Sequence, residues 1–466
     1  MFLQYIMKLT IVNNNYIFAK KEDAKLKKVK KVLVILCAFV IVLSSFMLVG
    51  CDKDAGNGNG DNGGNNGATN TGTNSNTSTD ISTYVRVDAD GNETPDGKYI
   101  LFGSYPQSKV TDKTVSAALT EAAGALPTKD SDGNWISYGY DIVFSVVAGD
   151  GAAEEPVNVV ASRTIKSYSW YIDREYNGAR YRGIYFLDYR PFTYLDCGEI
   201  AESMFSSEEE MNEWLDSITQ EWMEENWIIP TEENALQARN GYAKGSVYWF
   251  KYEPIKWRIL EEKDGKAFLM SDTALYSREM DDIINYNHKK ITEDDWYYYC
   301  NYAASDLRKW LNGSFYNDAF SDGQKDMIAV TTVSNGRDSY WDEDYGMYWC
   351  EDTEDKVFLL SEKEAIDAKY GFTAGDDPFE TKDTARRLQA SDYALGNGCF
   401  SGIHENPGYN GQVEYGVEEG CYWRLRSLGG EISDGVVVTP DGDFYFEDTG
   451  NFETCYGIAP VIWLNL

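Results

Sequence analysis

Histidine is nearly absent from this 466-residue chain, which contains only His288 and His404. Two histidines cannot build a multi-histidine metal centre, and each is interpreted as a surface polar residue. The chain also lacks the G-x-S-x-G, H-E-x-x-H and Walker sequences of common hydrolase, metalloprotease and nucleotide sites. These absences leave the sequence without a signal for a catalytic residue.

Cysteine is sparse, and its spacing selects no known site. None of the eight cysteines forms a C-x-x-C pair, so neither a thioredoxin-like site nor a zinc ribbon is predicted. Apart from Cys37 and Cys51 near the N-terminus, six thiols remain, and they allow 15 disulfide connectivities among which the sequence does not choose. These six are Cys197, Cys300, Cys350, Cys399, Cys421 and Cys455.

Positive charge is scarce as well, because the chain has 42 Lys and Arg but 76 Asp and Glu, which gives a net charge of −34. The first 50 residues hold eight Lys, one Glu and one Asp, so their removal would take the net charge to −40. Binding to nucleic acid, or to anionic lipid by charge, is therefore not expected. Solubility outside the cell is the preferred interpretation, and recruitment of Ca²⁺ or cationic ligands by an acidic face is the alternative.

The N-terminal residues carry the clearest sequence motif of the chain, which concerns its location in the cell. A lysine-rich stretch ending at Lys31 leads into an apolar run over 32–49, with L-V-G-C at 48–51. This junction resembles the lipobox of bacterial lipoproteins. The resemblance implies that residues 1–50 are removed and that Cys51 is lipidated, which anchors the chain at the extracytoplasmic face of the cell membrane. An uncleaved transmembrane anchor is the alternative, because 17 or 18 apolar residues lie at the lower limit of spanning length.

Three parts are expected along the chain. Residues 1–50 are the lipoprotein signal peptide, 51–81 are the lipidated cysteine with a linker rich in Gly, Asn and Thr, and 82–466 are an extracytoplasmic globular domain. The linker has too few apolar residues to bury a core, so it is predicted to be a disordered tether with a reach of roughly 30 Å. The globular part is long enough to be one elaborated domain or two packed halves.

Helix caps and strand-like runs predict an α+β fold with a mixed, mostly antiparallel sheet and several short helices. Pro440-Asp441-Gly442 lies between two strand-like runs and predicts a hairpin turn. Caps and apolar spacing predict helices over 206–225, at Ser305 with an end at Gly313, at Ser321 and at Ser361. An Ala-rich composition predicts a further helix from Asp112 to Ala125.

Six blocks occur in a fixed order along the globular part: YILFGSYPQS at 99–108, YEPIKWRIL at 252–260, SDLRKWLNGSFYNDAF at 305–320, DKVFLLSEKEA at 355–365, YWRLRS at 422–427 and IAPVIWLNL at 458–466. Together they resemble the bacterial family called domain of unknown function 6273, from about Tyr99 to the C-terminus. The family usually ends in Val-Arg-Pro where this chain has Ile458-Ala459-Pro460, so any role of that arginine is in doubt here. The resemblance implies a surface lipoprotein or a module of a larger protein, and no particular activity.

A looser resemblance concerns the end of the chain. A strand with W-x-L-R-S, a glycine-rich hairpin and a final strand are similar to C-type-lectin-like and formylglycine-generating-enzyme-like domains. The analogy concerns the fold alone. Formylglycine formation would need a copper-binding cysteine pair, and no two cysteines stand at a short spacing, so that activity is disfavoured.

Candidate ligand contacts come from aromatic and acidic stretches at 296–306 and 340–355 and from arginines on a predicted strand. Flat rings stack on the C–H faces of sugars while carboxylates and amides accept hydroxyl protons. A tyrosine-rich loop that packs on itself is the alternative, as is a structural role for Arg426 and Arg308 in pairing with buried acids. The candidate ligand-binding residues are Trp341, Tyr345, Trp349, Arg424 and Arg426.

No catalytic residue, metal site or cofactor is predicted. Ca²⁺ has weak support from Asp88-x-Asp90-Gly91 and Asp130-x-Asp132-Gly133, since each is half of a calcium loop and is better explained as a turn. The leading hypothesis is a lipid-anchored surface protein that binds a glycan or cell-wall polymer, with no nucleic-acid partner and with its oligomeric state left open. An envelope polysaccharide hydrolase and a purely structural surface protein are the alternatives, and an enzyme is the less favoured of the classes.

The lipobox resemblance predicts that Cys51→Ala abolishes lipid attachment. Metabolic labelling with a tagged fatty acid should label the native chain and leave the variant as an unlabelled, uncleaved precursor. Cys37→Ala, which alters a cysteine within the removed segment, is the control and should label normally. Continued labelling of the Cys51→Ala chain would contradict the assignment.

Overall fold

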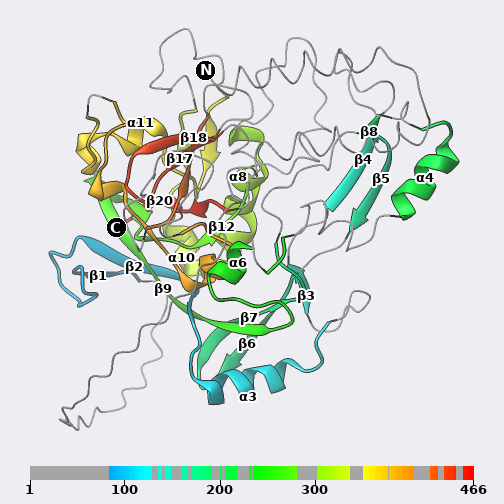
Figure 1. Cartoon of the computed structure of the whole chain (residues 1–466). Coiled ribbons are helices and arrows are strands. Elements are labelled where there is room, and N and C mark those ends of the chain that lie inside the picture. Colours follow the sequence, from blue (N-terminus) through cyan, green and yellow to red (C-terminus); the bar gives the residue numbers. More distant parts are fainter. Residues whose placement is uncertain are drawn as a thin grey trace, which may run out of the picture. The chain divides into compact units, whose positions relative to one another are not determined.

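Strand β9 (Val247–Lys263) is a central strand of the largest sheet that the structure describes (Figure 1). It pairs antiparallel with β2 (Tyr99–Lys109) along much of its length. On its other edge, the first half of β9 pairs with β7 (Ala179–Phe186) and the second half with β10 (Lys266–Ser271). The sheet therefore divides into two branches on that side, one for each half of β9.

The structure is a computed structural model, and all the residues it describes belong to one compact unit. Within these residues, no helix has the length and apolar character needed to cross a membrane. The described residues are 83–127, 135–138, 142–147, 159–165, 169–190, 200–201, 205–217, 230–232, 235–280, 302–335, 350–375, 377–401, 420–428, 435–447 and 455–466.

The first branch runs from β7 to β6 (Ser169–Tyr176) and then to β3 (Ile136–Tyr138), all antiparallel. Helix α3 (Lys113–Ala123) packs on this branch, and its Leu119 lies in an apolar cluster with Trp170 and Trp249. The Asp112 side chain caps this helix by accepting hydrogen bonds from the backbone N–H groups of Thr114 and Val115.

The second branch brings the C-terminus into the sheet. Strand β20 (Val461–Asn465) pairs antiparallel with β10, and β1 (Val85–Val87) pairs with β2 at the far side of the sheet. Residues near both ends of the described chain thus join one sheet. A separate three-stranded sheet comprises β4 (Ile142–Val147), β5 (Val159–Ile165) and β8 (Ile200–Ala201).

A second sheet of five strands carries the sequence YWRLRS. Its order is β12-β19-β16-β17-β18, and β16 pairs antiparallel with β17 and parallel with β19. The turn between β17 and β18 contains Gly442 at φ 85° and is closed by the Thr439 N–H donating to Asp443 O, so the predicted hairpin turn is confirmed. The strands are β12 (Tyr276–Ser277), β16 (Trp423–Leu428), β17 (Gly435–Val438), β18 (Phe444–Glu447) and β19 (Gly457–Ile458).

Two short pairs of strands complete the sheets. Strands β13 (Thr331–Val333) and β14 (Thr353–Asp355) are antiparallel, and β11 (Thr273–Ala274) and β15 (Gln389–Ala390) are parallel. With several short helices between mostly antiparallel strands, the structure confirms the predicted mixed α+β class.

The cap-based helix predictions are confirmed with local corrections. Helices α10 (Asp322–Met327) and α11 (Glu362–Ala365) each begin with the full reciprocal capping box expected at Ser321 and Ser361. Helix α4 (Glu208–Asp216) begins two residues after the predicted start at 206, and the Glu210 N–H donates to the Ser207 hydroxyl. The predicted continuation to 225 lies outside the described residues from 218 onward. Two further short helices are α6 (Leu236–Arg239) and α12 (Asp392–Gly396).

The Ser305 helix does not end at Gly313. Ser305 caps α8 (Asp306–Trp310) as predicted, but the chain continues through a π-helical turn, η4 (Leu311–Phe315), into α9 (Tyr316–Ala319). No side chain or backbone contact would oppose a Cβ at Gly313, and burial of the following aromatic residues favours continuation. Tertiary packing here outweighs the glycine stop signal.

Two strand predictions also need correction: GSVYWFKY at 245–252 and IKWRIL at 255–260 are predicted as separate strands, and KVFLLS at 356–361 is predicted as another strand. The runs on either side of Pro254 form one continuous strand, and β2 shifts register against β9 on both sides of the Ser104–Pro254 pair, where the proline lacks an N–H to donate. The run 356–361 makes only an isolated bridge between Phe358 and Val461, because the chain turns into α11 immediately afterwards.

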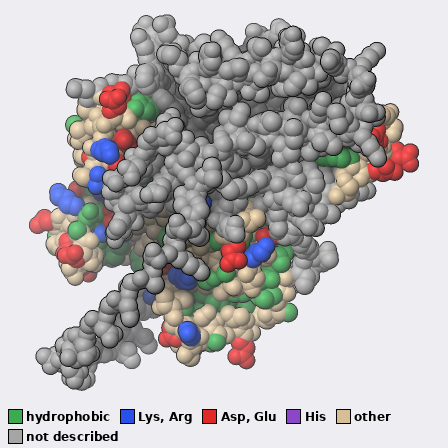
Figure 2. All heavy atoms as spheres, viewed as in Figure 1, with side chains coloured by type: hydrophobic (Ala, Val, Ile, Leu, Met, Phe, Trp, Pro, Cys, Tyr) green, Lys and Arg blue, Asp and Glu red, His purple; other side chains and the backbone are tan. Residues whose placement is uncertain are grey.

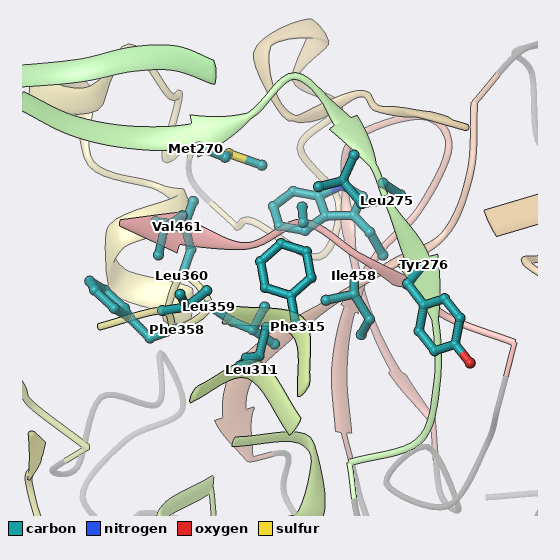
Figure 3. Close-up of a cluster of buried hydrophobic side chains, with 14 of the residues drawn as sticks. Met270, Leu275, Tyr276, Leu311, Phe315, Phe358, Leu359, Leu360, Ile458 and Val461 are labelled. Carbon is teal, nitrogen blue, oxygen red and sulfur yellow. The ribbon is translucent and has the colours of Figure 1, made fainter. Parts of the chain in front are cut away.

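The main apolar core lies between the helical segment 302–319 and the C-terminal strands. Leu307 and Leu311 are fully buried, and Trp310 is half-buried. The Trp310 ring stacks on that of Tyr276 in β12, with 5.1 Å between the ring centroids. These three residues therefore anchor the helix against the sheet, as their spacing predicts. Figure 3 shows side chains of this helical segment facing those of the C-terminal strands.

Charged side chains of both signs are interspersed over the described residues on the face drawn in Figure 2. One ionic cluster surrounds the buried Arg182 side chain and joins the first sheet branch to α9. Asp173 of β6 accepts from Arg182 Nε at 2.8 Å and Arg180 Nη2 at 2.6 Å, and Arg182 Nη2 reaches Asp318 Oδ2 of α9 at 3.1 Å. Burial acts to raise the pKa of Asp173, but hydrogen bonds and charge from Arg182 and Arg180 outweigh it and lower that pKa below the ordinary 3.8.

This shift makes stability depend on pH in the acid range. A carboxyl whose folded-state pKa is depressed contributes stability fully above its unfolded pKa, near 3.8, and loses it as the pH falls through the lower folded-state value. Asp173→Asn should lower the free energy of unfolding at neutral pH by about 2–4 kcal/mol and should flatten the acid loss measured by urea titration. The exposed Asp326→Asn change is the control. Parallel acid profiles for the native and Asp173→Asn chains would contradict the expectation.

Candidate functional site

The structure places two of the predicted ligand-binding residues, Arg424 and Arg426, on strand β16. Trp341, Tyr345 and Trp349 lie outside the described residues. The same holds for the lipid-attachment candidate Cys51, for both histidines and for the Asp130 motif. The site can therefore be described from β16 and from the residues on either side of 336–349.

Arg426 is buried and joins three segments that are distant in sequence. Its Nη1 donates to Leu359 O at 2.6 Å and to the Glu364 carboxylate of α11, while Nη2 donates to Ser334 O at 3.1 Å. Only 5% of the residue is exposed. The pairing with Glu364 confirms the predicted structural ion pair, and a direct contact between Arg426 and a ligand stays a prediction.

Arg424 is fully buried on the same strand. The centre of its guanidinium lies 5.2 Å from the centroid of the Tyr456 ring, a cation–π distance. Trp423 and Leu425, which alternate with the arginines, are fully buried too. Both faces of β16 are therefore covered by protein, and a ligand role for Arg424 also stays a prediction.

The two ends of the 336–349 segment are held together beside Arg426. Strands β13 and β14 pair antiparallel immediately before and after it, and the Cys350 N–H donates to Asn335 O at 3.2 Å. The Asn335 N–H donates to Asp352 Oδ1 at 3.1 Å, and its Nδ2 donates to Glu351 O at 3.0 Å. We call residues 331–335 and 350–355 the hairpin base.

The hairpin base is fixed to helix α8 by a second ion pair. Arg308 Nε donates to Asp355 Oδ1 at 2.7 Å, and the Asp355 side chain is completely buried. Asn312 Nδ2 and the Thr353 hydroxyl donate to the same carboxylate at 3.1 and 2.6 Å. This arrangement confirms the predicted pairing of Arg308 with a buried acid, and it fixes one strand of the base to the core.

Three polar atoms at the base have no hydrogen-bond partner within the part of the chain that is described: the Tyr302 hydroxyl, Asn335 Oδ1 and Arg426 Nε. Burial, then the charge of Asp355, raises the pKa of Tyr302, although Arg426 and Arg308 oppose this shift. An unpaired buried polar atom costs about 1–3 kcal/mol. Water or a hydroxyl-bearing ligand would satisfy such atoms.

Metal chemistry gains no support from the described residues, which contain no group of three or more His, Cys, Asp or Glu able to hold an ion. The Asp88 half-loop is a turn, because its Oδ1 accepts from the Asn92 N–H at 2.9 Å and Gly91 adopts φ 85°. The hydrogen bonds that the Asp88 carboxylate accepts from the backbone and side chain of Asn92 lower the pKa of Asp88. The preferred interpretation of that motif is confirmed.

Several residues of the site were not predicted individually. Tyr302 lies within the aromatic stretch 296–306, of which 296–301 is outside the described residues. Asn335 and Asn312 carry no spacing signal, since each acts through contacts with segments remote in sequence. The sequence could have drawn attention to Asn312 only through its place in the block SDLRKWLNG.

The described residues form a mixed α+β fold in which the hairpin base is hydrogen-bonded to strand β16 of the five-stranded sheet. Residues 264–466 match the family described as Domain of unknown function (DUF6273). No curated protein and no solved structure matches the chain. The hairpin base and β16 both fall within the matched range, whereas the blocks at 99–108 and 252–260 precede it. Because β9 pairs with β10, the sheet of the DUF6273 domain continues into that preceding part.

The hairpin base predicts a specific loss of stability when its buried carboxylate is removed. Asp355→Ala leaves Arg308, Asn312 and Thr353 without their shared acceptor, so the free energy of unfolding should fall by about 3–5 kcal/mol in denaturant titration. Glu354→Ala, at the exposed neighbouring position of β14, should cost less than about 1 kcal/mol. Equal effects of the two changes would contradict the role assigned to Asp355.

Proposed function

We propose that the chain is a lipid-anchored, extracytoplasmic surface protein that binds a glycan or surface polymer. The L-V-G-C junction supports the anchor, and the match to a family of unknown function is compatible with it. We further propose that the DUF6273 part has a C-type-lectin-like fold, on the strength of the closing strand, hairpin and strand order. The observation that carries the binding function is the hairpin base on β16.

The base presents a segment whose composition suits sugars. Residues 336–349 contain Tyr340, Trp341, Tyr345, Tyr348 and Trp349 together with Asp342, Glu343 and Asp344. Aromatic rings stack on sugar C–H faces, and carboxylates accept hydrogen bonds from hydroxyls. A rigid support reduces the ordering cost of binding, and the paired strands below this segment supply such a support.

In this proposal, Arg426 positions the base and the aromatic residues meet the ligand. Its Nη1 and Nη2 are committed to Leu359 O, Ser334 O and Glu364. A guanidinium engaged in this way gains little by turning to a ligand, since breaking buried charged hydrogen bonds is costly. The segment 336–349 therefore supplies the contacts, with Trp341, Tyr345 and Trp349 as the ligand-facing residues.

A glycan array probed with the full-length, detergent-solubilised chain tests this function. Trp341→Ala and Trp349→Ala should each weaken binding to the array's positive glycans by at least about tenfold while leaving the thermal midpoint unchanged. Tyr445→Ala, an exposed aromatic on β18, is the control and should bind normally.

The other outcomes decide between the rival functions. Release of reducing sugar from the bound glycans would replace the binding module with an envelope polysaccharide hydrolase. Absence of both binding and turnover would leave a structural surface protein. Normal binding by both tryptophan variants would show that the ligand contacts lie elsewhere.

A further inference from the structure

The fold brings together two cysteines that are far apart in sequence. Ser401 and Cys421 form an antiparallel bridge, and the Tyr422 N–H donates to Phe400 O at 3.1 Å. Cys399 lies two residues before Ser401, and the alternation of side chains along an extended segment would place it on the side of Ser401 and Cys421. Backbone pairing therefore places the two thiols as neighbours across the start of β16.

The surroundings of the two thiols support this placement. Cys399 and Cys421 are both fully buried thiols. A Cβ built on Gly457 would lie 3.4 Å from Cys399 Sγ and 3.0 Å from Tyr422 O, so Gly457 of β19 lies next to both Cys399 and the residue that follows Cys421. Interaction with the neighbouring Cys421 side chain, and then burial, raises the pKa of the Cys399 thiol.

A raised pKa favours a structural role over a reactive one. The thiolate is the nucleophile and metal ligand, and an apolar, buried environment disfavours it. Reactive cysteines instead have lowered pKa values and partial exposure. The pair thus has the properties of a buried cross-link position.

We propose that Cys399 and Cys421 form a disulfide in the mature protein. The bond would close residues 400–420 into a loop and fasten the chain after α12 to the start of β16. It removes conformations from the unfolded chain and holds the strand that carries Arg424 and Arg426. The proposal rests on the extracytoplasmic location proposed above, because disulfides persist in oxidising compartments.

The oxidant is a disulfide, either of an oxidoreductase or of a small thiol such as glutathione. One cysteine thiolate attacks a sulfur of the incoming disulfide and displaces one thiolate. The other cysteine then attacks the mixed disulfide and displaces the second thiolate. Two cysteine protons pass to the two released thiolates, and the incoming disulfide is reduced by two electrons. Because both sulfurs are buried once folding is complete, the exchange takes place before the sheet closes over them.

Cys455 is the competing partner. The Phe400 N–H donates to Cys455 O at 2.8 Å, which brings this residue to the same segment. Its side chain, however, lies in a different apolar cluster, with Leu236 and Val437. Cys350 is also buried but lies at the hairpin base, where its pKa is raised by burial.

Peptide mass mapping of the full chain tests the pairing. The reduced, denatured chain is refolded with oxidised glutathione, denatured again, alkylated without reductant and digested. A linked pair of peptides containing Cys399 and Cys421 is expected, lighter by two hydrogen atoms than the sum of its thiol forms. Cys350→Ser should retain the link, whereas Cys421→Ser should leave Cys399 alkylated.

Alkylation of both Cys399 and Cys421 in the refolded native chain, or a Cys399–Cys455 link, would overturn the proposal. Circular dichroism of the same sample establishes that the chain has refolded. The chain taken from cells without reductant should contain the same link. If the refolded chain forms the link but the cell-derived chain carries two thiols, the pairing holds and the extracytoplasmic location is wrong.

Discussion

Buried arginine side chains are the constraint on which the rest of this structure depends. A guanidinium cannot lose its charge, so burying it requires acceptors for its donors. Arg386 illustrates the consequence, because it is fully buried and donates to Gly442 O, Thr373 O and Thr381 O. Arg182, Arg190 and Arg426 are buried in the same manner, each among acceptors from remote segments. Each of these four arginines thereby contacts at least one segment that does not pair with its own segment of the chain.

Arg426 makes this constraint relevant to function. Its acceptors come from the run before α11, from α11 itself and from the hairpin base, so the position of the base follows from the position of β16. The proposed disulfide acts at the other end of the same strand. Together they would hold β16 at both ends and so fix the position of the hairpin base.

Local signals in the sequence predicted much of the fold. The capping boxes at Ser321 and Ser361 and the turn at Gly442 are set by neighbouring residues, and all three are confirmed. The continuation of the Ser305 helix and the convergence of Cys399 with Cys421 could not be predicted, because both arise from tertiary packing. The sequence also drew attention to Arg426 but did not reveal that it is almost completely enclosed.

The most direct test of this account is amide hydrogen exchange at the hairpin base of an Arg426→Met chain. If Arg426 positions the base, the Cys350 amide, which donates to Asn335 O, should exchange much faster than in the native chain. Arg174→Met alters an arginine on β6 and should leave that amide unchanged. Equal protection of the Cys350 amide in the native and Arg426→Met chains would contradict the account.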